Sequence, residues 1–155
     1  WPEQAGLDAW GVGWDMVDPE LGAYPVTHPL QSLDDVDDLP MPDFSTAPYS
    51  EKAQAWMAAD DRADFWLMGR VGETLFERAW MLLGMENLMI GLFENPDGVR
   101  RLFRRIADAR AAMIARHHAA GCEASTDSCE TGTDQLCCFC VHDKTPFEKT
   151  IVRWW

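Results

Sequence analysis

The segment from residue 63 to residue 121 constrains the fold more than any other part of this 155-residue chain. It opens with a short apolar run over residues 64–69, which is typical of a buried strand. Apolar residues then recur at helical spacing over residues 75–84 and again over residues 85–93. A longer helical pattern follows. This order of one strand and three helices predicts an α/β fold.

The long helical pattern has the clearest boundaries. Asn95 can cap the first turn, Pro96 suits the first helical position, and Asp97 is an acid at the positive end of the helix dipole. Gly121 supplies a left-handed stop, so a helix is predicted over residues 97–120. Its expected buried stripe is formed by Val99, Leu102, Phe103, Ile106, Met113 and Ile114.

A second strand is predicted over residues 122–126. Strand and helix alternate up to this point, so the two strands should be adjacent and parallel, as in a βαβ unit.

The first sixty residues predict smaller elements. Residues 7–28 have the pattern of two short strands around a turn, in which Asp18 and Pro19 begin the turn and Gly22 lets it close. One or two helical turns are expected over residues 33–39, before Pro40 and Pro42. A short helix is expected over residues 48–59, with Ser50 as its cap. Apolar spacing assigns five tryptophans to the core or a pocket wall: Trp10, Trp14, Trp56, Trp66 and Trp80.

The net charge of −13 argues against a nucleic-acid-binding protein or a protein of anionic membranes, because both need clustered cations. The arginines of the long helix are expected to form its solvated face, and His117 and His118 to be surface residues that complement the helix dipole. The most apolar stretch, residues 79–93, is too short to span a bilayer. With no signal peptide in view, we expect a soluble cytoplasmic protein.

All five cysteines lie in the last 34 residues. Their odd number, without a secretory signal, favours reduced thiols over a disulfide framework. Cys137, Cys138, Cys140 and His142 are zinc-ligand types close together, but a single residue between Cys138 and Cys140 is a tighter spacing than structural zinc sites use. A metal-binding tail therefore stays an alternative.

Four stretches together resemble the uroporphyrinogen decarboxylase family, which includes corrinoid and thiol methyltransferases on the same barrel fold. The first is DAWGVGW at residues 8–14, followed by HPL and LDDVDDL. The second covers residues 67–92, with its glycines and acids in matching order. The third is ENPDGVRRLFRRI at residues 94–106 and the fourth is DSCETGTDQ at residues 127–135. No match continues beyond Cys137.

The resemblance implies a fragment of a (β/α)8 TIM barrel, with an N-terminal β-hairpin-like segment, over residues 1–135. Residues 136–155 would form a divergent, irregular Cys-rich tail. Such a barrel typically needs about 250 residues. The implied activity of the full-length protein is tetrapyrrole decarboxylation, a lyase reaction of porphyrin biosynthesis, or corrinoid- or thiol-linked methyl transfer.

The resemblance also implies partners and cofactors. The partner would be a tetrapyrrole or a methyl donor such as a corrinoid protein, and a homodimer is a further expectation. No cofactor is expected, except zinc in a methyltransferase-like full-length protein. The fragment alone is expected to be inactive.

The implied pocket lies at the carboxyl ends of the barrel strands. Asp127 and Glu130 are the catalytic candidates, while Arg70, Glu73 and Gln135 are the substrate-binding candidates. An arginine suits a substrate carboxylate because its fork pairs with both oxygens. A carboxylate could hold a pyrrole N–H or act as a general acid.

Simpler assignments remain open for these residues. Arg70 could form a salt bridge with Glu73 or Glu77, and Asp127 and Glu130 could serve a turn or a helix cap. The alternative for the whole chain is a small non-enzymatic α+β module that binds metal through its Cys-rich tail. A part-barrel would expose sheet edges and an apolar patch, expected to include some of Trp66, Trp80 and Leu92.

Overall fold

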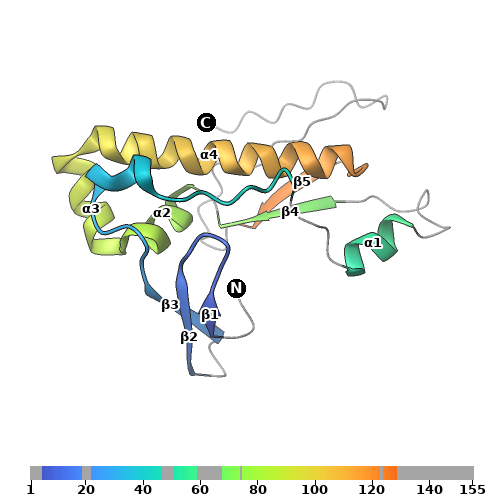
Figure 1. Cartoon of the computed structure of the whole chain (residues 1–155), viewed down its shortest axis with the longest axis horizontal. Coiled ribbons are helices and arrows are strands. Elements are labelled where there is room, and N and C mark those ends of the chain that lie inside the picture. Colours follow the sequence, from blue (N-terminus) through green and yellow to red (C-terminus); the bar gives the residue numbers. More distant parts are fainter. Residues whose placement is uncertain are drawn as a thin grey trace. The chain divides into compact units, whose positions relative to one another are not determined.

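The computed structural model describes residues 5–18, 22–46, 51–58, 68–73, 75–122 and 124–128 (Figure 1). Strands, one 3-10 helix and four α-helices alternate along these residues. In chain order they are β1 (Gly6–Leu7), β2 (Gly13–Asp18), β3 (Gly22–Thr27), η1 (Leu33–Asp38), α1 (Glu51–Met57), β4 (Met68–Gly72), α2 (Leu75–Leu83), α3 (Met85–Glu94), α4 (Pro96–Ala119) and β5 (Ala124–Ser128).

The chain divides into two compact units, each made of two separate stretches. Unit 1 comprises Trp1–Pro42 and Leu75–Ala109, and unit 2 comprises Asp43–Thr74 and Arg110–Trp155. The long helix α4 is continuous across the boundary, so its first part belongs to unit 1 and its last part to unit 2.

Unit 1 begins with an antiparallel sheet in the order β1-β2-β3. Gly13 pairs with Thr27 and Trp14 with Pro25, which confirms the predicted hairpin. The strand begins later than its apolar alternation indicated, because Trp10 and Val12 lie in the turn before Gly13. Trp10, Val12 and Trp14 are nevertheless buried, so the prediction that both tryptophans belong to the core is confirmed.

The core of unit 1 lies between η1 and the three helices α2, α3 and α4. Leu33 of η1 fits against two glycines: a Cβ on Gly98 would lie 2.9 Å from Leu33 Cβ, and a Cβ on Gly91 would overlap the Leu33 side chain. The helical turns predicted over residues 33–39 are therefore present and are held by packing. The fully buried side chains around them include Val36, Met81, Leu82, Leu83, Leu88, Leu102 and Ile106.

Helix α4 has the ends that its sequence predicted. Asn95 Oδ1 accepts a hydrogen bond from the Gly98 backbone N–H at 2.9 Å, which satisfies a free donor of the first turn. At the other end Gly121 has a φ of 84°, a left-handed conformation that glycine adopts without a steric penalty. Val99, Leu102 and Ile106 of the predicted stripe are buried, and Phe103, Met113 and Ile114 are half-buried.

The arginines of α4 differ from the solvated row that was expected. Arg110 is buried. Arg105 is half-buried and donates to the carbonyls of Val36 and of Leu39, the latter at 2.7 Å, where η1 ends. The prediction was wrong for these two because the end of η1 and the loop after β4 offer carbonyls that need donors. Arg100, Arg101 and Arg104 are exposed as expected.

Unit 2 contains the parallel pair β4–β5, which confirms the predicted adjacency of the two strands. β5 starts at Ala124, later than the predicted residue 122, because Cys122 still belongs to the end of α4: its N–H donates to the His117 carbonyl at 3.0 Å. β4 covers Met68–Gly72, and residues 64–67 of the predicted strand lie outside the described residues. The elements form a mixed α/β fold.

Helix α1 confirms the short helix predicted before β4, while its expected cap, Ser50, lies outside the described residues. No helix in the described part of the chain combines the length and the apolar character needed to cross a membrane.

Candidate functional site

The β4–β5 register brings two of the predicted site residues to adjacent positions along the ladder. Arg70 pairs with Thr126, and the next pair along the ladder is Val71 with Asp127. Arg70 and Asp127 are thus one residue apart in register. Both lie inside their strands, whereas the sequence predicted that both would follow a strand. Two further candidates, Glu130 and Gln135, lie outside the described residues.

Glu73 follows β4 directly and has an unusual backbone. Its φ of 46° makes it the one non-glycine residue with positive φ in the described ranges. For a residue with a Cβ this left-handed conformation costs about 1–2 kcal/mol. Something must therefore hold Glu73 in place.

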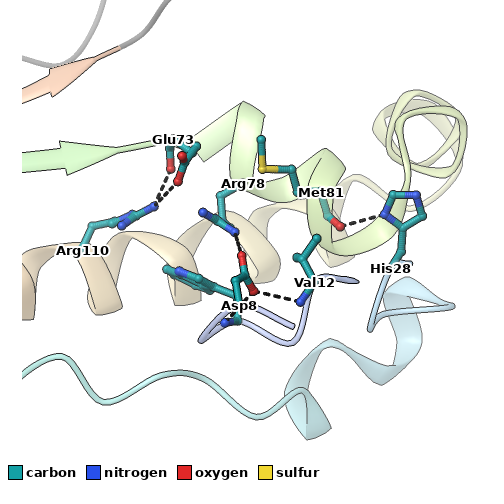
Figure 2. Close-up of polar contacts among 8 residues, drawn as sticks. Asp8, Val12, His28, Glu73, Arg78, Met81 and Arg110 are labelled. Carbon is teal, nitrogen blue, oxygen red and sulfur yellow. Dashed lines mark hydrogen bonds and ion pairs between the residues drawn. The ribbon is translucent and has the colours of Figure 1, made fainter. Parts of the chain in front are cut away.

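Arg110 supplies that hold from α4 (Figure 2). Its Nη2 donates to the Glu73 carbonyl at 2.8 Å and lies 3.7 Å from Glu73 Oε2. The side chains of Arg110 and Glu73 are only 9% and 21% exposed. Because this pair is largely shielded from water, Glu73 contributes to the turn after β4, and its assignment as a substrate-binding residue rests on the resemblance alone.

The surroundings of Arg110 are largely apolar. Its guanidinium lies 6.0 Å from the centre of the Phe44 ring, and its Nη1 is 3.9 Å from Met113 Sδ. The sequence contained a signal for this residue that was missed: Arg110 stands four positions after Ile106 and three before Met113, inside the apolar stripe of the helix. A cation at such a position must either leave the stripe or find a partner in the core.

His117 marks the contact of α4 with the other end of β4. Gly69 is so close to the imidazole ring that a Cβ there would overlap His117. Burial lowers the pKa of His117 from 6.5, and the charge of Arg116 lowers it further. The expectation of a surface histidine was therefore wrong for His117, whose position four after Met113 again continues the stripe. His118 is exposed, as expected.

A second polar cluster lies in unit 1 and centres on Asp8 (Figure 2). Asp8 Oδ1 accepts from the backbone N–H groups of Trp10 and Val12, both at 2.9 Å. Asp8 Oδ2 lies 2.8 Å from Arg78 Nη1 in an ion pair whose side chains are 17% and 4% exposed. The Arg78 guanidinium also stacks over the Trp10 ring at 5.0 Å. The DAWGVGW motif thus has a structural role in this chain, because its acid and tryptophan hold α2.

The HPL motif has a comparable role at the end of α2 (Figure 2). His28 Nδ1 lies 2.7 Å from the Met81 carbonyl oxygen, and the Leu30 N–H donates to the Leu82 carbonyl at 2.9 Å. The last turn of a helix leaves carbonyls without intrahelical donors, and these two residues satisfy them.

The described residues therefore place Arg70 and Asp127 one position apart along the β4–β5 ladder and on opposite faces of the sheet, with the turn held by Glu73 and Arg110 directly after β4. Within the described ranges, no group of three or more His, Cys, Asp or Glu residues is arranged to bind a metal ion. The cysteine cluster after Cys129 lies outside those ranges. Comparison with family models, curated proteins and solved structures found no match.

Proposed function

We propose that this chain is part of a (β/α)8-barrel enzyme of the uroporphyrinogen decarboxylase type. Its full-length protein would decarboxylate a tetrapyrrole or transfer a methyl group between a corrinoid and a thiol. The substrate would bind at the carboxyl end of the β4–β5 sheet, where parallel strands in barrels carry their active sites.

The observation that carries this proposal is the parallel pairing of β4 with β5 after a helical connection. A parallel pair requires a crossover, and the repeated strand–helix–strand unit is the building block of the barrel. The register brings Arg70 and Asp127, 57 residues apart in sequence (127 − 70), to adjacent positions on opposite faces of the two strands, so a pocket that uses both would lie beyond the strand ends.

The proposed chemistry assigns separate roles to the two kinds of side chain. Arg70 would pair with a substrate carboxylate, assisted by Glu73 and Gln135 at the rim of the pocket. Asp127 and Glu130 would hold a pyrrole N–H or transfer a proton as general acids. Removing a general acid typically lowers a rate by about 10²- to 10⁴-fold.

The test measures both reactions in the protein encoded by the complete reading frame that contains this sequence. Decarboxylation is followed by separating porphyrin products by carboxyl number, and methyl transfer by the absorbance of the corrinoid. Glu130→Gln and Asp127→Asn keep the shape and remove a charge, so each should lower kcat by at least tenfold with an unchanged melting temperature. Glu94→Gln, a change at an exposed acid of α3, is the matched control.

Neither activity is expected from the 155-residue chain alone. The proposal is wrong if the complete protein catalyses neither reaction, or if Arg70→Met and Glu130→Gln both leave kcat/KM unchanged. Stoichiometric zinc that is lost on changing Cys138 and Cys140 would instead support the metal-binding alternative.

A further inference from the structure

The contact between Arg110 and Glu73 combines a close hydrogen bond with a loose ion pair (Figure 2). Arg110 Nη2 donates to the Glu73 backbone carbonyl at 2.8 Å, a normal hydrogen-bond distance. The same nitrogen lies 3.7 Å from Glu73 Oε2, whereas a charge-assisted hydrogen bond between a guanidinium and a carboxylate is about 2.7–2.9 Å long. Arg110 therefore holds the main chain of Glu73 more closely than it holds the carboxylate.

The surroundings of Arg110 favour a carboxylate as its partner. The Arg110 side chain is only 9% exposed, and the Phe44 ring and the Met113 sulfur lie beside its guanidinium. A cation that is shielded from water in this way interacts more strongly with an anion than an exposed cation does. The planar guanidinium also matches a carboxylate in shape, because it can donate to both oxygens.

Glu73 supplies its carboxylate from a strained position. Its φ of 46° lies in the left-handed region, and strain of this kind persists at ligand clamps and switch regions where the surrounding structure holds it. The Glu73 side chain is more exposed than that of Arg110, so the carboxylate is the part of the pair nearer to solvent. An anion from solvent can thus replace the carboxylate while the hydrogen bond to the carbonyl is retained.

We propose that Arg110 binds a carboxylate of a small-molecule ligand, and that the Glu73 carboxylate occupies this site until the ligand displaces it. The turn after β4 keeps its shape during the exchange, because Arg110 holds the turn through a main-chain carbonyl. That the ligand is the substrate rests on the proposed function, since this turn lies at the carboxyl end of β4. Arg110 would then bind a second substrate carboxylate, in addition to the one assigned to Arg70.

The experiment uses the whole chain at micromolar concentration, with propionate as the probe and propionamide as the uncharged compound of the same shape. Saturation-transfer NMR on the methyl signal of each compound gives its dissociation constant. Glu73→Gln removes the competing charge, so it should bind propionate at least about tenfold more tightly than the wild type, and propionamide no more tightly. Glu51→Gln removes an exposed acid of the same unit and should bind propionate like the wild type.

Further variants locate the bound anion. Arg110→Lys keeps the charge but removes the planar fork, so in the Glu73→Gln background it should return propionate binding to the wild-type level. Arg104→Lys, at an exposed position of the same helix, should leave binding in that background unchanged. Glu73→Gly also lacks the carboxylate, and glycine adopts a φ of 46° without a steric penalty. It should therefore bind propionate as tightly as Glu73→Gln and remain folded, which circular dichroism checks.

Two outcomes would overturn the proposal. Equal binding of propionate by the wild type and by both Glu73 variants would mean that the Glu73 carboxylate does not occupy an anion site. Tight binding that survives Arg110→Lys would place the anion on another cation. The first comparison does not depend on the folding of Arg110→Lys. Both are separate from the enzymatic proposal, because propionate binding is measured on this chain and the two activities on the complete protein.

Discussion

Three ionisable side chains occupy positions that helical spacing assigns to the core. Arg78, Arg110 and His117 each stand three or four residues from apolar neighbours in the buried stripe of their helix. Arg78 pairs with Asp8 and stacks over the Trp10 ring. Arg110 donates to the Glu73 carbonyl and lies near its carboxylate. His117 lies against Gly69 of β4. For the two arginines, an ionisable side chain inside an apolar stripe thus coincides with a buried and partnered group, whereas His117 is half-buried.

The contact between Gly69 and His117 leads to a first prediction. Gly69→Ala should destabilise the protein by about 1–3 kcal/mol, because the added methyl group overlaps the imidazole and the neighbours must shift. Urea unfolding measures the change. In a His117→Ala background the same substitution should cost markedly less. Equal costs in both backgrounds would mean that the ring does not lie against the glycine.

His117 also predicts a pH dependence of stability. Its pKa is lowered in the folded state, so the unfolded chain takes up a proton first as the pH falls below about 6.5. The contribution of His117 to the free energy of unfolding is thus present above that pH, and it is lost as the pH falls towards the pKa of His117 in the folded state. His117→Gln should flatten the decrease in urea midpoint between pH 7.5 and pH 5.5. His118→Gln, at an exposed neighbour, should leave the decrease intact.

At the scale of elements, the helices followed local sequence signals closely and the strands did not. Asn95, Pro96 and Gly121 fixed the ends of α4 because caps act within one turn. Strand limits depend on the partner: β5 begins only after Cys122 has completed the end of α4. Because strand limits depend on pairing, Arg70 and Asp127 lie within their strands and do not follow them. The sequence could predict that the two positions are close in register, but not where along the strands they pair.

The ion pair between Asp8 and Arg78 ties the turn before β2 to helix α2. Arg78→Met should destabilise the protein by about 3–5 kcal/mol, because it leaves a shielded carboxylate without its cation. Two backbone N–H groups still bind Asp8, which favours the lower end of that range. Arg100→Met removes an exposed ion pair with Asp97 and should change stability by less than about 1 kcal/mol. Urea unfolding of both variants makes the comparison, and equal effects would contradict a structural role for Asp8.

At the scale of the whole molecule, the sequence predicted an α/β fold and one parallel strand pair, and both are present. The division into two interleaved units was not anticipated, because local periodicity carries no information about which distant stretches pack together. The barrel and the pocket remain proposals, since they require strands beyond β4 and β5. Leu92, named in the expected apolar patch, is 40% exposed, while Trp80 is half-buried and Trp66 lies outside the described residues.

A part-barrel would leave the edges of the β4–β5 sheet unpaired, and this predicts self-association of the chain. Among the described residues, this sheet consists of two strands, and unpaired strand edges attract further strands. Light scattering after size-exclusion chromatography should therefore show oligomers that increase with protein concentration. Phe93→Ser should leave this association unchanged, since α3 lies in the other unit. A cooperatively melting monomer at all concentrations would contradict the part-barrel interpretation.

The pairing of Asp8 with Arg78 also determines when the first hairpin can be completed during synthesis. The two residues are 70 positions apart, so at about 5–20 residues per second the aspartate leaves the ribosome roughly 4–14 s before its arginine. During that interval the turn holds an uncompensated carboxylate, and Trp10 lacks the guanidinium that covers it. Nascent chains stalled before residue 78 should thus expose this tryptophan, and chains stalled well beyond it should protect it.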